Sequence, residues 1–316
     1  MTGAPDNRLD IVLLSGYLGA GKTTWLRHAL FARTFGPAMV FVQEAAEQPV
    51  DDLLLGQALD VRVLTGKAGT PEGRDEMVAA LLDIAEARTG GASGIQPQTL
   101  IIETSGLADP AQIIQAIRNH PVLVYHFVLR ETIIMSDAIH LRAALESDPL
   151  CRSQLLCADR IVMSKAEAVA PQELSNLVAT LAQINPAAPV SLSSFGIENA
   201  LPGLPAPTAV LRVATPDDGV IANAVSLPFP ARIDWIEFTV WLSALLHAHG
   251  DTILRVKGVI ATDEGALLLQ SVRKTMQQPE ILPPEQSGAA SGDIVFIGAN
   301  LSRQILQDSL FRFLAG

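Results

Sequence analysis

The residues with the clearest chemical meaning stand near the start of the chain, in the sequence GYLGAGKTT. They fit the phosphate-binding pattern G-x-x-x-x-G-K-[ST], in which glycines allow backbone N–H groups to turn inward around a di- or triphosphate. Lys22 is expected to reach the β- and γ-phosphates, and Thr23 to bind Mg²⁺. The predicted nucleotide-binding residues of this loop are Gly16, Gly19, Ala20, Gly21, Lys22, Thr23 and Thr24.

The motif has the flanking elements that phosphate binding requires. Residues 11–14 form an apolar run that predicts a buried strand before the loop, and apolar residues at helical spacing within 25–30 predict a helix after it. The N-terminus of that helix would point at the bound anion. A chance match is the alternative for any short motif, but it would not come with both elements. The sequence therefore predicts nucleotide binding.

A second candidate site lies at the end of the predicted strand at residues 99–103. Glu103 leaves a predicted buried strand and is placed to hold Mg²⁺ together with Thr23, while Gly106 would let a backbone N–H approach the γ-phosphate. Hydrolysis would then remove this contact and cause the loop to move. Alone, the sequence E-T-S-G also fits a plain strand-to-loop turn. The upstream phosphate loop favours the functional interpretation, with Lys22 and Glu103 as catalytic candidates.

The composition restricts the class of protein. A chain of 316 residues with 49% hydrophobic and 17% charged residues is typical of a globular protein of about two domains. The net charge of −11 argues against nucleic acid or an anionic membrane as the main partner. No apolar run approaches the roughly 18–20 residues of a membrane span, and the first residues lack the order of a signal peptide. We therefore expect a cytoplasmic protein.

Short apolar runs alternate with helical patterns through residues 1–199. This alternation predicts an α/β fold, a P-loop NTPase with a mainly parallel sheet flanked by helices. Within it, residues 122–129 and 132–136 are interpreted as two separate strands. The following Pro-rich stretch, residues 200–230, is predicted to be a linker.

Residues 231–316 are predicted to form a smaller α+β domain. Residues 232–239 alternate as a strand would, and residues 240–249 have a helical pattern. Further strands are expected at the apolar runs that follow, before a closing amphipathic helix at residues 302–314. The chain is thus expected to contain two domains of unequal size.

Six segments together resemble the CobW-type GTPases. In the first domain they are GYLGAGKTT, ETSGLADP (residues 103–110), QLLCADRIVMSK (154–165) and INPAAPV (184–190); in the second they are ILRVKGVI (253–260) and IVFIGANL (294–301). The resemblance covers nearly the whole chain. It implies a P-loop GTPase domain followed by a CobW C-terminal domain, slow Mg²⁺-dependent hydrolysis of GTP, and delivery of a metal, often zinc or cobalt, to a client protein.

The segment that should read the base departs from this family's N-K-x-D motif. Here it is Ser164-Lys165-Ala166-Glu167. A Glu can still accept both hydrogen bonds from guanine, but its extra methylene moves the carboxylate by about an ångström or more. The serine lacks the amide that steadies the neighbouring loops, whereas the stem of Lys165 would still cover the base. We expect a weakened preference for GTP, with ATP as the alternative nucleotide.

The family's switch segment, N-E-F-G-E followed by an Asp, is replaced here by Q-E-A-A-E at residues 43–47 and then Asp51. The resemblance makes Asp51 a candidate catalytic residue, with Glu44 and Glu47 as further acidic candidates. A solvated acidic loop is the alternative to a role in binding Mg²⁺, water or a cargo metal.

The family's metal motif, G-C-x-C-C, is also lost. Its position after Leu64 carries Gly66-Lys67-Ala68-Gly69-Thr70, without a thiolate. A tight Zn²⁺ or Co²⁺ site needs three or four soft or imidazole ligands. The chain's 2 cysteines, Cys151 and Cys157, do not form a usual zinc pattern. We therefore expect the usual Zn²⁺ or Co²⁺ cargo site to be missing.

Three functions stay open on the sequence alone. The first is a CobW-like GTPase that serves metal or cofactor homeostasis with an unidentified client protein, which could complete the metal site. The second is a nucleotide-dependent switch or adaptor that binds GTP or ATP and carries no metal. The third is a small-molecule kinase, against which the E-T-S-G segment and the second domain argue. The sequence does not define the oligomeric state.

Overall fold

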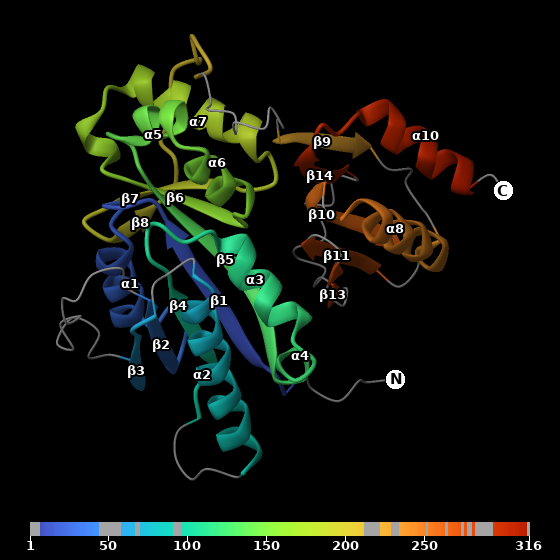
Figure 1. Cartoon of the computed structure of the whole chain (residues 1–316). Coiled ribbons are helices and arrows are strands. Elements are labelled where there is room, and N and C mark those ends of the chain that lie inside the picture. Colours follow the sequence, from blue (N-terminus) through green and yellow to red (C-terminus); the bar gives the residue numbers. More distant parts are fainter. Residues whose placement is uncertain are drawn as a thin grey trace. The chain divides into compact units, whose positions relative to one another are not determined.

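The computed structural model describes residues 7–43, 58–66, 70–90, 96–211, 222–228, 234–250, 252–262, 265–272, 275–276, 280–281 and 293–314. The chain divides into two compact units, one of residues 1–180 and 188–213 and the other of residues 181–187 and 214–316 (Figure 1). The first has a mainly parallel sheet and the second a smaller antiparallel one. The predicted α/β class, with a smaller α+β domain after it, is confirmed.

The first unit is built on an eight-stranded sheet in the order β3-β2-β4-β1-β5-β6-β7-β8. Neighbouring strands are parallel except the last pair, β7 and β8, which are antiparallel. The strands are β1 (Leu9–Gly16), β2 (Ala38–Gln43), β3 (Asp60–Leu64), β4 (Thr99–Glu103), β5 (Phe127–Asp137), β6 (Arg160–Ser164), β7 (Val190–Ser194) and β8 (Ile197–Asn199).

Helices cover this sheet on both sides (Figure 1). Every residue of β2 and β4 is buried, which requires cover on both faces. On one face the cover is α1, through a core cluster that includes Trp25, Leu26 and Leu30. The helices are α1 (Lys22–Phe31), α2 (Pro71–Thr89), α3 (Pro110–Asn119), α4 (Leu123–His126), α5 (Leu141–Ser147), α6 (Pro149–Leu156) and α7 (Pro171–Ile184), with a 3-10 turn, η2, at Ala166–Ala168.

The strand order places β1 at the topological switch point of the sheet, where successive strands are added first on one side and then on the other. From β1 the chain passes through β2 and β3 back to β4 on one side, and then crosses to β5 on the other side. In sheets of this type, ligands bind beside such a crossover, at the carboxyl ends of the strands. The carboxyl ends of β1, β4, β5 and β6 are Gly16, Glu103, Asp137 and Ser164.

β5 is one strand where the sequence pattern predicted two. The short helix α4 precedes it, and Phe127–Asp137 is then continuous. Arg130 and Glu131 interrupt the apolar pattern, but both are paired. Arg130 Nε donates to Asp10 Oδ2 at 3.0 Å, and Arg160 Nε donates to Glu131 Oε1 at 2.8 Å. The predicted break was wrong because charged side chains with such partners can stand within a strand.

Two stretches inside the predicted linker have defined structure. One runs along α7, where Ser175 Oγ donates a hydrogen bond to the carbonyl of Pro205 at 2.6 Å. The other, Ala222–Pro228, is β9, a strand of the second sheet. Val225 and Leu227 of β9 are buried. Their alternation is too short to stand out among the surrounding prolines.

The second unit has an antiparallel sheet in the order β12-β11-β10-β14-β9, with β13 paired to β11. Its core is mainly aliphatic and includes an aromatic group, in which the ring centroid of Trp241 lies 5.7 Å from that of Phe238 and 6.1 Å from that of Phe296. The further elements are α8 (Trp235–His249), β10 (Ile253–Thr262), β11 (Gly265–Val272), β12 (Thr275–Met276), β13 (Glu280–Ile281), β14 (Asp293–Ala299) and α10 (Arg303–Leu314).

α8 begins earlier than the sequence pattern predicted. Asp234 caps it, because Asp234 Oδ1 accepts hydrogen bonds from the N–H groups of Ile236 and Glu237 at 2.8 and 3.0 Å. The strand expected at residues 232–239 is therefore wrong from Trp235 onward. The apparent alternation of apolar residues covers the first turns of a helix whose buried side chains are Phe238, Trp241, Leu242 and Leu246.

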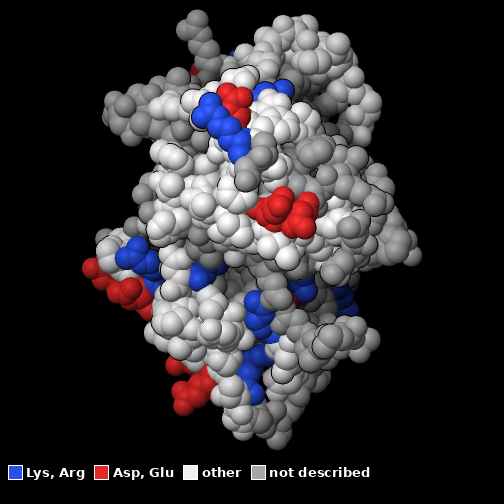
Figure 2. All heavy atoms as spheres, turned by 90° about the vertical axis from the view of Figure 1, so that its right-hand side faces the viewer, with Lys and Arg blue, Asp and Glu red and all other residues white. Residues whose placement is uncertain are grey.

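Charged side chains are sparse on one face of the molecule. Figure 2 shows Lys and Arg in small groups on it, some of them directly beside Asp and Glu, with uncharged residues between the groups. On this face the described residues form no broad basic surface. Among the helices within the described ranges, none combines the length and apolar character that crossing a membrane requires.

Candidate nucleotide-binding site

The phosphate loop has a conformation that depends on its glycines. Gly16, Gly19 and Gly21 have φ angles of 136°, 74° and 83°. At Gly16 a Cβ atom would lie 2.1 Å from the backbone oxygen of Met135 on the neighbouring β5, so a larger residue does not fit. α1 begins directly after Gly21. The loop therefore ends at a helix N-terminus, which favours a bound phosphate.

Lys22 folds back over this loop. Its Nζ donates hydrogen bonds to the backbone carbonyls of Gly16 at 2.9 Å and Tyr17 at 3.4 Å. Burial lowers the pKa of Lys22, and the nearby carboxylate of Glu103 opposes that shift. An ammonium group held on two carbonyls inside the loop can exchange them for phosphate oxygens, which are stronger acceptors.

Thr23 and Glu103 meet beside Lys22. Thr23 Oγ1 donates a hydrogen bond to Glu103 Oε1 at 2.6 Å, which joins the first turn of α1 to the carboxyl end of β4. Glu103 is buried. Both side chains offer hard oxygen donors, the ligand type that Mg²⁺ prefers. The two residues predicted as metal ligands therefore lie in contact, and their chemistry fits that ion. Of the remaining loop residues, Ala20 is fully buried and Thr24 lies in the first turn of α1.

The loop after Glu103 is held against the phosphate loop. The N–H of Thr104 donates to the carbonyl of Leu14 at 2.9 Å, and the hydroxyl of Thr104 donates to Ser15 Oγ at 2.8 Å. Further along, a Cβ atom on Gly106 would lie 2.6 Å from the backbone nitrogen of Leu18. The two loops are in backbone contact at this point, and a glycine allows that approach.

The segment predicted to read the base adjoins the phosphate loop. Lys165 Nζ donates to the carbonyl of Gly19 at 3.0 Å, and Ser164 Oγ donates to the carbonyl of Ala20 at 2.9 Å. The serine was expected to leave these loops less steady than an asparagine would. Its hydroxyl nevertheless ties the end of β6 directly to the phosphate loop.

Glu167 lies on the next turn, η2, and contacts the end of β7. Ser194 Oγ donates a hydrogen bond to Glu167 Oε2 at 3.2 Å. Sequence reasoning did not single out Ser194, because a lone serine at the end of a strand carries no signal. The contact places the carboxylate of Glu167 against the carboxyl end of β7, one turn after the end of β6.

Asp137, at the carboxyl end of β5, is a second residue that sequence reasoning missed. Its Oδ2 accepts a hydrogen bond from Lys165 Nζ at 2.6 Å and lies 2.8 Å from His140 Nδ1. Burial alone would raise the pKa of Asp137, but its hydrogen bonds with Lys165, His140 and the Ile139 N–H lower it overall. Asp137 therefore holds Lys165 in place. A signal was available, because Asp137 ends an apolar strand as Glu103 does.

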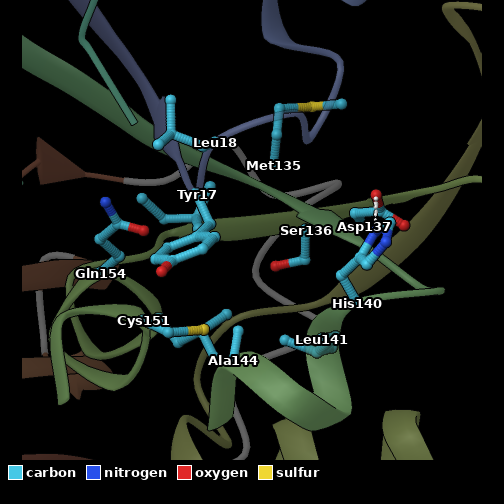
Figure 3. A pocket seen from close by; sticks show the side chains of 12 residues that line it. Tyr17, Leu18, Met135, Ser136, Asp137, His140, Leu141, Ala144, Cys151 and Gln154 are labelled. Atoms are coloured by element: carbon cyan, nitrogen blue, oxygen red, sulfur yellow. Dashed lines mark hydrogen bonds and ion pairs between the residues drawn. The ribbon is translucent and has the colours of Figure 1, made fainter. Parts of the chain in front are cut away.

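A pocket opens beside the phosphate loop (Figure 3). Its empty space, including the open mouth, is about 320 Å³. The loop contributes Tyr17 and Leu18, the end of β5 contributes Asp137, and α5 and α6 form the remaining wall. Tyr17 Oη donates a hydrogen bond to Asp148 Oδ2 at 2.7 Å, so the phosphate loop is tied to the start of α6.

The position expected for the family's metal motif is described only at its edges. Glu76 of α2 accepts hydrogen bonds from the N–H and hydroxyl of Thr65, both at 3.1 Å, and from the N–H of Gly66. Thr70 caps α2. Residues 67–69 lie outside the described residues, as do Glu44, Glu47 and the catalytic candidate Asp51. In the part of the chain that the structure describes, no three His, Cys, Asp or Glu side chains gather as a metal-binding group.

Two family models match the chain. The CobW/HypB/UreG nucleotide-binding domain matches residues 10–191, and the cobalamin synthesis protein cobW C-terminal domain matches residues 222–314. The chain belongs to the CobW/HypB/UreG family. The resemblance inferred from the sequence motifs is thereby confirmed, including the C-terminal domain.

Two Escherichia coli proteins are similar to this chain. The zinc chaperone YjiA is 31% identical over 94% of this chain and 96% of its own length. The zinc chaperone YeiR is 29% identical over 51% of this chain and 47% of its own. A crystal structure described as Zn(II)-bound YjiA GTPase matches with a TM-score of 0.62 at 26% identity, covering 98% of this chain and 99% of that one. The fold is therefore that of a CobW-type P-loop GTPase.

Proposed function

We propose that this protein binds GTP with Mg²⁺, hydrolyses it slowly, and uses the cycle in metal or cofactor homeostasis. The contact of 2.6 Å between Thr23 Oγ1 and Glu103 Oε1 carries the proposal, because it assembles two oxygen donors next to the phosphate-binding lysine. The zinc-chaperone relative YjiA supports the link to metals. When bound, Mg²⁺ would supply positive charge to the transferring phosphoryl group.

The chain's own residues have separate parts in this proposal. Backbone N–H groups of the loop that starts at Gly16 would surround the phosphates, and Lys22 would neutralise charge on the β- and γ-oxygens. Gly106 would let a backbone N–H approach the γ-phosphate. Lys165, fixed by Asp137 and the carbonyl of Gly19, would lay its stem along the base. Asp51 stays a candidate for positioning the attacking water.

Release of inorganic phosphate tests this function directly. The purified chain should release phosphate from GTP slowly in the presence of Mg²⁺, and chelation with EDTA should abolish the release. A parallel assay with ATP gives the ratio of the two rates of phosphate release, which measures the preference for guanine over adenine. Absence of binding and of phosphate release with both nucleotides would overturn the proposal.

Base selection gives a prediction about Glu167. The preference for GTP over ATP should fall below the ~10⁴–10⁵-fold that well-placed buried polar groups can provide, because the Glu167 carboxylate stands one methylene too far out. Glu167→Asp should sharpen the preference. Calorimetric titration of both nucleotides measures this preference. Glu173→Asp is the matched control, because Glu173 of α7 binds Arg142 of α5 at 2.7 Å.

The same titrations can also contradict the role proposed for Glu167. If the wild type binds GTP and ATP with equal affinity and Glu167→Asp does the same, Glu167 does not read the base. Glu167 would then serve only as the hydrogen-bond acceptor of Ser194.

A second function, a nucleotide-dependent switch without a metal cargo, is favoured by the absence of thiolates at positions 67, 69 and 70. If a metal is carried, a client protein must contribute ligands. Metal titration of the purified chain with and without nucleotide separates the two functions, because only a metal carrier should bind Zn²⁺ or Co²⁺ with an affinity that depends on the nucleotide.

We expect isolated wild-type protein to bind Zn²⁺ or Co²⁺ weakly, through carboxylates such as Glu44, Glu47 and Asp51. Replacing these three by amides should abolish that binding. The triple variant Lys67→Cys/Gly69→Cys/Thr70→Cys should create thiolate-to-Co²⁺ charge-transfer absorption. The single variant Thr70→Cys is the control, because Thr70 Oγ1 accepts from the N–H of Gly73 at 3.2 Å and its loss removes a helix cap. A tight, stoichiometric Zn²⁺ site in the wild type would contradict this expectation.

A further inference from the structure

The loop after Glu103, residues 104–109, is fixed at both ends by hydrogen bonds. At the first end, Thr104 is hydrogen-bonded to β1. At the second, Asp109 Oδ1 caps α3 by accepting the N–H of Ala111 at 3.0 Å. Between these ends, backbone at Gly106 touches the phosphate loop. The position of this middle part decides whether a γ-phosphate can be contacted.

The middle of the loop is held from α6 by Gln154. Its Nε2 donates hydrogen bonds to the carbonyl of Gly106 at 3.1 Å and to the carbonyl of Ala108 at 3.0 Å. Gln154 is only 1% exposed, so neither bond competes with water. One side-chain amide, which has two N–H donors, thus restrains two peptide units on either side of Leu107.

α6 is also tied to the phosphate loop and to α3. Tyr17 Oη donates to Asp148 Oδ2, the cap of α6, and Ser153 Oγ donates to Asp109 Oδ1 at 3.3 Å. Tyr17 and Gln154 line the same pocket and lie near each other in it (Figure 3). A movement of the loop after Glu103 must therefore be accommodated by α6, and the pocket provides room for side chains to rearrange.

We propose that Gln154 is a positioning residue for GTP hydrolysis: its amide sets the loop of Gly106 and Ala108 at the distance from the phosphate loop that the γ-phosphate requires. The inference rests on the proposed function and adds to it a residue that touches neither nucleotide nor metal. Because it acts on the γ-phosphate side, GDP, which lacks that group, should bind almost independently of Gln154.

Gln154→Met tests the proposal, because methionine fills a similar volume and donates no hydrogen bond. The kcat for GTP should fall about tenfold, with GDP affinity within about twofold of the wild type. Gln154→Asn, too short to reach both carbonyls, should share the loss. Gln172→Met is the matched control, since Gln172 Nε2 donates to the carbonyl of Ala206 at 2.9 Å on the surface of α7. An unchanged kcat in both Gln154 variants, or an equal loss of GDP affinity, would overturn the proposal.

Hydrogen exchange separates this proposal from the proposed function. In nucleotide-free protein, amides of residues 104–109 should exchange at least about tenfold faster in Gln154→Met than in the wild type, while Gln172→Met leaves them unchanged. This readout needs no hydrolysis, so it holds even if the wild type fails to turn over GTP. Unaltered exchange in the Gln154 variant would show that its two hydrogen bonds do not position the loop.

Discussion

Lys22→Ala is expected to weaken triphosphate binding by at least about 2 kcal/mol, close to a 30-fold rise in Kd. The ammonium group already lies inside the phosphate loop, on the carbonyls of Gly16 and Tyr17. Its loss removes the charge-assisted contacts to the β- and γ-oxygens and leaves backbone N–H groups alone to bind the anion. Calorimetry with a non-hydrolysable GTP analogue and with GDP measures the effect.

Two comparisons make this result specific. Lys22→Arg keeps the charge but replaces a compact ammonium by a planar guanidinium, and should stay impaired because the loop encloses Nζ closely. Thermal unfolding of nucleotide-free Lys22→Ala checks that the variant stays folded, so that a loss of affinity can be assigned to the missing ammonium group. Unchanged triphosphate affinity in Lys22→Ala would reject the assignment of the phosphate loop.

The phosphate-binding part of the site could be predicted from the sequence because its information is local. The glycine conformations, the lysine and the start of α1 all lie within residues 16–24, and the motif prescribes them together. The strand ending at Glu103 was predicted because its three central residues, Leu100, Ile101 and Ile102, form an apolar run, and the structure shows the whole strand buried. Parallel strands then bring Glu103 to the same edge as the loop, which makes the contact with Thr23 a consequence of fold class.

The rest of the site depends on contacts that sequence spacing does not encode. Asp137 is 28 positions from Lys165, and Gln154 is 48 positions from Gly106. Each pair is brought together by the order of the strands and by the packing of α6. The same limitation explains the errors in β5 and α8. Arg130 looked like a break because its partner Asp10 lies 120 positions away, and Asp234 was not recognised as a cap.

Thr23→Ala and Glu103→Gln are each expected to lower kcat for GTP by about 100-fold or more, with a much smaller effect on GDP affinity. Under the proposed function both side chains hold the Mg²⁺ that would stabilise charge developing at the γ-phosphoryl group, which GDP lacks. Thr99→Val is the matched control: it removes a hydroxyl at the opposite end of β4, where Thr99 Oγ1 donates to the carbonyl of Phe35 at 3.0 Å. Its kcat should stay within about twofold of the wild type.

The double variant distinguishes a shared ion from two separate roles. If Thr23 and Glu103 hold the same Mg²⁺, as their 2.6 Å contact suggests, the first substitution already removes most of the benefit. The kcat of the double variant should then lie within about threefold of that of the more impaired single variant. If the two residues had independent roles, the two losses of kcat would multiply. Multiplied losses would separate the residues, and wild-type rates in both single variants would show that the ion is bound elsewhere.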